Sequence, residues 1–526
     1  MRILLVRPPA RRFPGQVEPS AGLPLGCLYI AAVLEAADHD VSVLDCQLYD
    51  DDQSCWRWDG SEVFGTPWSE VEREIRRYSP DLVGISNQFT AQIDTAVKVA
   101  EIVKRIDPNI VTIIGGNHVS ALPKSFLELS NSIDIVCMGE GEHRLLDIIC
   151  CLNGKRGLED VKGIAFRKGG MVIVNEQGPY LTPQELDALP FPAYHLVDME
   201  RYFRLQERGY LARGHYEYPG SHRAVPMITS RGCPYNCTFC SIHLHMGKRF
   251  RSHSVSRVLE HIKLLTSQYG IRHIYFEDDN LTLDIDRFSR LLDGLLAKQF
   301  GITWDTPNGV RVDLLPKELI AKSKEAGCTH LVVGVESGNQ ANLDRIVKKK
   351  LDLQHVERAA RACKELGLDL WAFFIIGFPQ ETIEDMQATL DYALRLEREY
   401  DVLPILNILK PLIGTEVYRE ALARGYLLED LTPATMGASI AGRGLIETEN
   451  FTRTEIARLA NGFYRKNKLL LVKKTARFIL RHPKALTRLV GNLLRSPNRK
   501  QTMRIAMGYT NCLVRDFGRY EIESRS

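Results

Sequence analysis

The sequence predicts an α/β protein with two successive regions of alternating strands and helices, followed by a helical C-terminal region. Short apolar runs alternate with helical periods over residues 1–150 and again from residue 225, and the alternation stops after residue 430. Fully apolar strands that are separated by helices are typical of parallel sheets covered on both faces. The length of 526 residues exceeds what one hydrophobic core usually supports and indicates several domains.

Residues 1–150 are expected to form a doubly wound, Rossmann-like parallel sheet. Ligands of such sheets bind at the carboxyl ends of the strands, where this sequence has glycines and small polar residues that let a large ligand approach the backbone. None of these segments is a G-x-G-x-x-G or Walker loop, so a nucleotide is not the expected ligand. The expected strands are 2–6, 40–45, 81–86, 110–116 and 133–139, and the expected helices are 26–37, 69–78 and 94–106.

Residues 225–430 are expected to form a TIM-type (β/α) barrel, complete or partial. Helical periods such as 254–268 and 285–298 separate six apolar runs, and barrels collect functional residues at the C-terminal ends of their strands. Residues 151–224 are mixed in pattern and are interpreted as a connector, because the stretch 186–198 is interrupted by prolines. The six strand-like runs are 225–230, 273–279, 302–309, 330–338, 370–379 and 403–411.

Composition favours an ordinary globular protein. Hydrophobic residues make up 44% and charged residues 25% of the chain, with a formal net charge of +3. No apolar run reaches the roughly 18–20 residues that a membrane span needs, and the start "MRILLVRPPARR" lacks the features of a signal peptide. The expected compartment is therefore the cytoplasm, where scattered cysteines such as Cys27 and Cys46 are expected to be reduced.

The stretch "TSRGCPYNCTFCS" places Cys233, Cys237 and Cys240 in a C-x3-C-x2-C pattern. A structural zinc site would need a fourth ligand, for which His243 and His245 are candidates. A disulfide framework would leave an odd thiol and does not suit a reducing compartment. An iron–sulfur cluster held by three thiolates would keep one of four irons open, and an open metal position is where a substrate binds.

The cysteine pattern resembles that of the radical S-adenosylmethionine (SAM) superfamily, because Phe239 precedes the last cysteine and "MITS" precedes the loop as a first barrel strand. The resemblance implies that the three cysteines bind a [4Fe-4S] cluster, whose open iron is chelated by the amino and carboxylate groups of SAM. It also implies cleavage of SAM by one electron to methionine and a 5′-deoxyadenosyl radical, which abstracts a hydrogen atom from an unactivated C–H bond. An external electron donor such as flavodoxin or ferredoxin is then expected.

The second and third barrel strands end in segments that resemble motifs of this family. "FEDDNLT" implies that Asp278 and Asp279 help to hold the methionine amino group, although an Asp pair after a strand also suits the N-cap of the next helix. "NGVRVD" implies that Arg311 meets the SAM carboxylate, and the alternative interpretation is a surface arginine.

The fourth and fifth strand ends continue the resemblance. "VGVESG" implies that Glu336 and Ser337 face the ribose and methionine of SAM, and an acid in so apolar a run is costly without a partner. "FFIIGFPQET" implies that the backbone near Ile375 and Gly377 passes the adenine. Gln380 stands where the family usually has a second glycine.

Residues 1–150 resemble the N-terminal domain of cobalamin-dependent radical SAM enzymes through "PSAGLPLGCLYIAAVLEAADHDVSVLD", "GGNHVSALP" and "GEGEH", and "LKPLIGTEVY" resembles the sixth strand end of that branch. The D-x-H-x-x-G signature is absent, so no protein histidine is expected on cobalt. For Gly139 and Gly141, capping of the next helix is an alternative. The resemblance implies cobalamin contacts for Ser86, Asn87, Gln88, Gly115, Gly116, His118, Gly139 and Gly141. His118 is expected to shape the phosphate or nucleotide-tail loop.

The two resemblances together imply methylation of an unactivated carbon by methylcobalamin, on a hydrophobic or natural-product small molecule. One alternative is a radical rearrangement, cyclisation or oxidation in which cobalamin only carries electrons. A second alternative is a non-enzymatic iron–sulfur module that binds nucleic acid and ignores SAM. No code for the substrate can be read from the loops.

The C-terminal region, residues 431–526, is expected to be basic and helical. Between Glu455 and Asp516 it holds fifteen Lys or Arg and no acidic residue. A helical cap with a solvated basic face and a basic surface on anionic lipid through residues 456–515 are the two leading interpretations. Nucleic acid binding is disfavoured because no recognition module accompanies the charge. The lipid interpretation would make the protein membrane-associated on the cytoplasmic face, with a lipid or tetrapyrrole as substrate.

Overall fold

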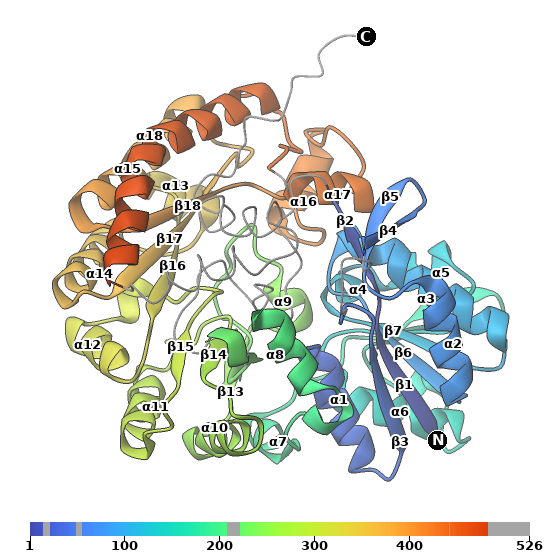
Figure 1. Ribbon diagram of the computed structural model, residues 1–526. Helices are drawn as coiled ribbons and strands as arrows, with labels where there is room; N and C mark the ends of the chain where they lie inside the picture. Colours follow the sequence, from blue (N-terminus) through green and yellow to red (C-terminus); the bar gives the residue numbers. More distant parts are fainter. Residues whose placement is uncertain (14–21, 49–54, 208–220, 441, 482–526) are drawn as a thin grey trace.

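The computed structural model describes residues 1–13, 22–48, 55–207, 221–440 and 442–481. An N-terminal α/β domain lies beside a second α/β domain whose helices form the outer wall of a curved sheet (Figure 1). Helices from the C-terminal region cover the second domain and reach back to the first (Figure 1). None of the described helices is both long and apolar enough to span a bilayer.

The N-terminal sheet has seven strands in the order β10-β9-β8-β7-β6-β1-β3. All five predicted strands are confirmed and pair in parallel, while β9 and β10 add an antiparallel hairpin beyond the predicted boundary at residue 150. The strands are β1 (Arg2–Arg7), β3 (Asp40–Asp45), β6 (Leu82–Ser86), β7 (Val111–Gly115), β8 (Ile135–Cys137), β9 (Ile164–Lys168) and β10 (Met171–Val174).

Helices cover both faces of this sheet, which confirms the doubly wound arrangement. Successive side chains of β1 alternate between two cores, so Ile3 and Leu5 pack on one face while Leu4 and Val6 pack on the other. The first face is covered by α1 (Leu25–Glu35) and α6 (Glu142–Leu152), and the second by α2 (Trp68–Tyr78), α3 (Ile93–Ile106) and α5 (Pro123–Leu129).

A small antiparallel sheet beside this domain was not expected from the sequence. It consists of β2 (Ala10–Arg12), β5 (Ser61–Phe64) and β4 (Cys55–Trp58). The turn between β4 and β5 is Asp59-Gly60, with φ angles of 49° and 70°, and Asp-Gly is a favoured pair for a two-residue hairpin turn with both φ angles positive. The segment to the second domain includes α7 (Pro183–Ala188) and α8 (Met199–Glu207).

The second domain is a six-stranded partial barrel. β11, β14 and β15 form one parallel sheet and β16, β17 and β18 another, and the bridges Trp304–Cys328 and Val310–Val333 join the two. Among the described residues β11 and β18 do not pair, so the barrel stays open between them. The strands are β11 (Ala224–Met227), β14 (His273–Phe276), β15 (Thr303–Asp305), β16 (His330–Glu336), β17 (Asp369–Ile376) and β18 (Leu403–Ile408).

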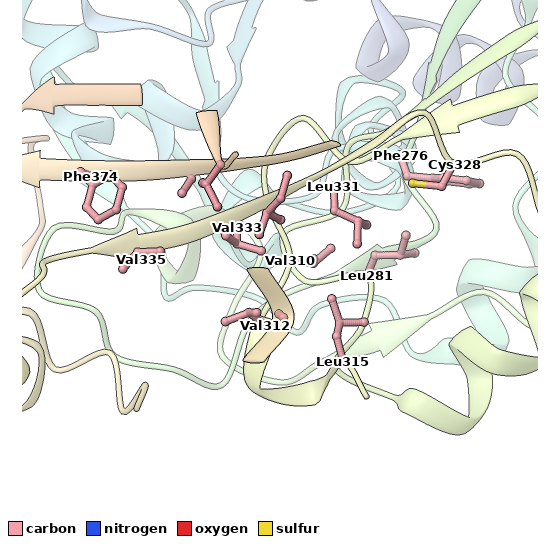
Figure 2. Packing of buried hydrophobic residues seen from close by; sticks show 14 of the residues in the cluster. Phe276, Leu281, Val310, Val312, Leu315, Cys328, Leu331, Val333, Val335 and Phe374 are labelled. Carbon is pink, nitrogen blue, oxygen red and sulfur yellow. The ribbon is translucent and has the colours of Figure 1, made fainter. Parts of the chain in front are cut away.

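The core of the barrel fills the space between strands and surrounding helices. Figure 2 shows Val310, Val312, Val333 and Val335 gathered between neighbouring strands, with Phe374 from β17 further along. Their burial explains why the predicted runs are apolar throughout. The surrounding helices are α10 (Val255–Tyr269), α11 (Ile285–Lys298), α12 (Lys317–Glu325), α14 (Leu353–Leu366) and α15 (Ile383–Tyr400).

The C-terminal region connects both domains. In α18 (Arg453–Arg481), Ile456 and Phe463 are buried on the barrel side, against α15 and β18. In α17 (Pro433–Ile440), Met436 joins a small apolar cluster with Phe13 and Ala91 of the N-terminal domain. α16 (Glu416–Ala423) lies between β18 and this region. Residues 482–526, which hold much of the predicted basic region, lie outside the described residues.

Candidate active site

The three cysteines lie on a loop that is closed at its neck. β12 (Ser230–Arg231) pairs antiparallel with β13 (Arg251–Ser252), so residues 232–250 form one excursion that includes the short helix α9 (Ile242–His245). Gly232 has a φ of 82°, and a Cβ there would lie 2.4 Å from the carbonyl oxygen of Arg249. Only glycine fits this close contact between the two sides of the neck.

The thiols of Cys233, Cys237 and Cys240 are free and partly buried. Within the described part of the chain, no three His, Cys, Asp or Glu side chains gather closely enough to hold a single metal ion. A four-iron cluster extends over several ångströms and takes its thiolates at separate corners, which is compatible with cysteines that do not converge on one point.

The electrostatic surroundings of the thiols suit a cluster. Burial raises the pKa of all three thiols, that of Cys240 to about 12. At Cys233 and Cys237 the nearby cations Lys349 and Arg311 offset part of this rise in pKa. Thiolates therefore form here with a metal rather than as free anions. Three reduced thiols with two cations beside them fit a [4Fe-4S] cluster.

Asp278 and Asp279 follow β14 but do not cap the next helix, because Asp284 is the N-cap of α11. Asp278 is 2% exposed and accepts hydrogen bonds from the backbone and hydroxyl of Thr229 and from the hydroxyl of Ser230. It thus supports the segment that leads into the cysteine loop.

The carboxyl of Asp279 is placed differently. It accepts a hydrogen bond from the backbone of Gly232, and burial, with the charge of Asp278, raises its pKa to about 7. Such a group gains a stable negative charge when a cation binds beside it. Its role toward the amino group of SAM stays a prediction that this environment suits, while Asp278 already has protein partners.

Arg311 is 7% exposed, so it is not a surface arginine. Its guanidinium donates to both carboxylate oxygens of Asp313 at 3.0 and 2.8 Å, and it stacks 3.9 Å from the ring centroid of Tyr235 on the cysteine loop. It also donates to the carbonyl oxygens of Lys349 and Lys350 at 2.8 and 2.7 Å. Arg311 therefore ties the cysteine loop to the segment after β16, and contact with the SAM carboxylate stays a prediction.

Glu336 ends β16 in a strained conformation next to a buried cation. Its φ of 71° is unusual for a residue other than glycine, and the register of β16 against β17 shifts between Gly334 and Glu336. Its carboxylate accepts from Nζ of Lys349 at 2.7 Å, with side-chain exposures of 7% and 12%. A Cβ at Gly334 would lie 2.4 Å from this carboxylate, so the glycine leaves room for the pair.

The other predicted SAM contacts differ in accessibility. Ser337 is fully buried, and its hydroxyl lies 3.1 Å from that of Thr389 on α15. Ile375 is half-buried in β17. Gly377 has a φ of 95°, and its N–H donates to the buried carboxylate of Glu381 at 2.8 Å. Burial raises the pKa of Glu381 to about 7. These contacts fix the turn after β17, and the adenine contact stays a prediction.

The predicted corrin loops lie at the carboxyl ends of β6, β7 and β8. The backbone N–H of Asn87 donates to the carbonyl of Gly115 at 2.7 Å, and a Cβ at Gly116 would lie 2.1 Å from the carbonyl oxygen of Asn87. Asn87 is 2% exposed and its Oδ1 has no hydrogen-bond partner within the protein. Ser86 is half-buried and Gln88 exposed, next to Phe89, which is 63% exposed.

His118 lies on the short helix α4 (Asn117–Ala121), directly after the carboxyl end of β7. Its Nδ1 lies 2.9 Å from the hydroxyl of Thr90, its ring meets Phe126 edge to face, and burial lowers its pKa to about 4. It is therefore a neutral residue that joins two loops, as expected of a loop-shaping role. The unpaired atoms Asn87 Oδ1 and His118 Nε2, with an exposed aromatic ring beside them, fit a large polar-edged ligand such as cobalamin.

The loop after β8 holds both predicted glycines and two acids that sequence reasoning missed. Gly139 has a φ of 69°, and Gly141 is the N-cap of α6, as the alternative interpretation proposed. Glu140 and Glu142 are buried and form ion pairs with arginines at the neck of the cysteine loop. The sequence analysis also did not predict that Lys349 and Glu381 belong to the site. Their neighbours in the sequence, "KKK" and "QET", do not indicate that these two charges are removed from water.

The geometry thus places a three-cysteine loop against the Gly-rich edge of a doubly wound domain. α4 contacts α9, and a Cβ at Gly414, after β18, would touch Leu244 of α9 at 2.6 Å and Ala121 of α4 at 3.7 Å. The Radical SAM superfamily model matches residues 227–393, and the B12 binding domain model matches residues 18–149.

Relatives agree with this pair of domains. The uncharacterized methyltransferase PH0819 of Pyrococcus horikoshii is 33% identical over 428 residues, which cover 81% of this chain and 84% of that protein. The cytidylyl-2-hydroxyethylphosphonate methyltransferase of Streptomyces wedmorensis is 32% identical over 456 residues, covering 81% and 82%. The chain belongs to the cobalamin-dependent radical SAM enzymes. A [4Fe-4S] cluster, SAM and cobalamin are the cofactors of this family, and the non-enzymatic alternative does not fit it.

The fold of this radical SAM enzyme is also found in a solved structure. TsrM from Kitasatospora setae, a radical SAM methyltransferase determined with cobalamin and a [4Fe-4S] cluster bound, superposes with a TM-score of 0.66 at 17% identity. The match covers 87% of this chain and 90% of that one. The predicted order of domains and the partial barrel are thereby confirmed.

Proposed function

We propose that this enzyme methylates an unactivated carbon of a hydrophobic or natural-product molecule held between the carboxyl ends of its two sheets. The observation that supports this most directly is the contact between the neck of the cysteine loop and the loop after β8. When bound, the cluster and SAM supply a carbon radical and methylcobalamin supplies a methyl group. A substrate between the two loops would be reached from both sides, which is a matter of positioning.

In this proposal the protein holds and orients the reactants. Cys233, Cys237 and Cys240 bind the cluster, and Asp279 accepts the ammonium of SAM. The pair of Glu336 and Lys349 sets the charge beside the methionine and ribose. Contacts between α4, α9 and the segment at Gly414 exclude water from the space between the domains.

The test is anaerobic turnover with SAM that carries a deuterated methyl group. Cluster and cobalamin are reconstituted, a reductant is added, and cytidylyl-2-hydroxyethylphosphonate is offered first, because it is named for one relative. Lipid and tetrapyrrole fractions are offered next. The proposal expects 5′-deoxyadenosine together with a deuterated methyl in a product. Formation of 5′-deoxyadenosine with a product that gains no methyl would contradict methylation and favour the rearrangement, cyclisation or oxidation alternative.

We also propose that the basic C-terminal region contacts anionic lipid, which would deliver a lipid or tetrapyrrole substrate. The sequence of α18 and residues 482–515 is rich in Lys and Arg. The first turns of α18 pack on the barrel rather than facing a membrane, because the hydroxyl of Tyr464 donates to the carbonyl of Leu406 in β18 at 3.0 Å. Pelleting with anionic vesicles at low salt, and release at high salt, would support lipid contact, and indifference to vesicles at low salt would reject it.

A further inference from the structure

The two domains meet at a buried cluster of four charges that the proposed reaction does not use chemically. We propose that Glu140, Glu142, Arg231 and Arg251 form a clamp that fixes the cysteine loop against the corrin loop and so sets the separation of the cluster from cobalt. The four act as positioning residues. The inference rests on the proposed function, because it needs both cofactors to be bound.

All four side chains are removed from water. The exposed fractions are 8% for Glu140, 5% for Glu142, 6% for Arg231 and 3% for Arg251. Arg231 donates to Oε1 of Glu142 at 2.6 Å and to Oε1 of Glu140 at 3.2 Å. Arg251 donates to both oxygens of Glu140 at 2.7 and 2.9 Å. Two acids and two bases balance, so the cluster carries no net charge.

On the barrel side, the clamp holds the base of the cysteine loop. Arg231 and Arg251 are register partners in the β12–β13 ladder, and Cys233 follows Arg231 by two residues. Arg251 also donates to the carbonyl of Met246, just after α9, at 2.7 Å. A shift of the two guanidinium groups therefore moves the loop that carries the cluster ligands.

On the other side, the clamp holds the loop after β8. Glu140 and Glu142 flank Gly141, and Glu140 also accepts from the backbone N–H of Leu181 at 2.7 Å. Arg251 donates to the carbonyl of the same Leu181 at 2.8 Å. One network thus joins the corrin loop, the connecting segment and the cysteine loop, which lie far apart in the sequence.

Stability alone does not account for this cluster. A buried ion pair is often no more stabilising than a well-packed apolar replacement, because both charges lose their hydration. The ion pairs instead fix the relative orientation of the two loops, because a guanidinium and a carboxylate bind each other in few geometries. Radical transfer depends on such precision, because a misplacement of about 1 Å can cost about 10²-fold in rate.

The experiment measures the spacing of the two cofactors in the reconstituted holoenzyme. With cobalamin as cob(II)alamin and the cluster reduced, both are paramagnetic, and pulsed EPR relaxation of cob(II)alamin reports its distance from the cluster. Glu142→Gln and Glu140→Gln are expected to shift or broaden this distance by about 1 Å or more, and to lower the yield of methyl transfer per 5′-deoxyadenosine about 10-fold or more. Glu142→Asp keeps the charge and is expected to fall between the wild type and Glu142→Gln.

Two further variants separate the effect of orientation from a general loss of stability. Arg251→Lys retains the charge but loses the forked contacts, so it tests orientation with little disturbance of the fold. Asp305→Asn breaks a buried pair with His273, at 3.0 Å, inside the barrel, and is expected to lower the melting temperature without changing the distance. A clamp variant with both cofactors bound and an unchanged distance distribution overturns the inference. Absence of either cofactor from the wild type overturns the proposed function instead.

Discussion

The carboxyl ends of the barrel strands and those of the N-terminal sheet face each other at the domain boundary, and they differ in the polar groups that they carry. The strand ends of the barrel carry several buried or half-buried charges, among them Asp279, Glu336 and Lys349. At the ends of β6 and β7, the N-terminal sheet presents backbone, glycines and neutral groups such as Asn87 and His118. The acids after β8, Glu140 and Glu142, are already paired with arginines.

This difference matches the chemistry of the two ligands. SAM is a small, charged molecule, and buried charges discriminate strongly for it because each unpaired charge is costly. A corrin is large and flat, so close backbone and shape fit matter more. The comparison predicts that charge changes at Glu336 impair SAM binding most, and that steric changes at Gly116 impair cobalamin retention most.

The largest effect is expected from Cys237→Ala. Loss of one of three thiolates leaves a second iron without a protein ligand, so the cluster should not be retained and formation of 5′-deoxyadenosine should be abolished while cobalamin remains bound. Iron content, the EPR signal of the reduced cluster and the cobalamin absorbance after gel filtration are the measurements. Cys363→Ala, at a buried thiol of α14, is the control and should keep both cofactors. Undiminished turnover in Cys237→Ala would contradict the cluster assignment.

A large effect is also expected from Glu336→Gln. It leaves Lys349 buried without its partner, and breaking a buried pair typically costs about 3–5 kcal/mol. SAM affinity, measured by equilibrium dialysis, should fall at least about 10-fold if the lost interaction exceeds about 1.4 kcal/mol. Glu365→Gln, in the exposed pair with Lys317, is the control and should leave both stability and SAM affinity nearly unchanged, because exposed ion pairs contribute little. The double variant Glu336→Gln/Lys349→Met should recover stability but not SAM binding. Full SAM affinity in Glu336→Gln would argue against a charged SAM site here.

On the other edge, Gly116→Ala tests shape. Its φ of 131° and the 2.1 Å approach of a Cβ to the carbonyl oxygen of Asn87 together predict a local cost of roughly 2–6 kcal/mol. Cobalamin should be retained poorly, whereas the cluster should form normally. Gly154→Ala has a φ of 75° but nothing within 4 Å of the added Cβ, so it is the control for the same substitution at a positive-φ turn without a close contact. Equal cobalamin retention in both variants would show that the loop contact is unimportant.

The smallest effect concerns pH. Burial raises the pKa of Glu381 to about 7 from a usual value of 4.5. Its contribution to stability is therefore complete below about pH 4.5 and is lost as the pH rises through 7, by at most about 3 kcal/mol. Urea unfolding at pH 5 and pH 8 should show less loss of stability in Glu381→Gln than in the wild type. The same loss in both proteins would mean that Glu381 ionises normally.

Much of the fold can be predicted from the sequence because both sheets are buried on both faces. The five strands of the first domain and the six of the second stand out as apolar runs, and their ends carry the glycines and cysteines that indicate the cofactors. The hairpin β9–β10 falls in the segment predicted to be a connector, because that prediction rests on the prolines further along the segment, although β10 is the apolar run Met171–Val174. The turn Asp59-Gly60 did signal the β4–β5 hairpin, so that element could have been found.

The pairing of charges could not be predicted. Three adjacent lysines look alike in the sequence, but only the chain path after β16 brings Lys349 to Glu336. Arg311 was expected to meet the SAM carboxylate, yet Asp313 and two backbone carbonyls occupy most of its donors. Glu140 and Arg251 are separated by 111 residues, and no local pattern reveals such a contact.

The central claim is that three sulfur ligands leave one iron free for SAM to chelate. The direct measurement is the EPR spectrum of the oxygen-free, reduced enzyme before and after SAM is added. A four-iron signal whose g-values shift on addition of SAM, with Asp279→Ala and Glu336→Gln needing more SAM for the same shift, is the predicted result. A four-iron signal that SAM leaves unchanged, or the absence of such a signal from fully reconstituted protein, would contradict the account.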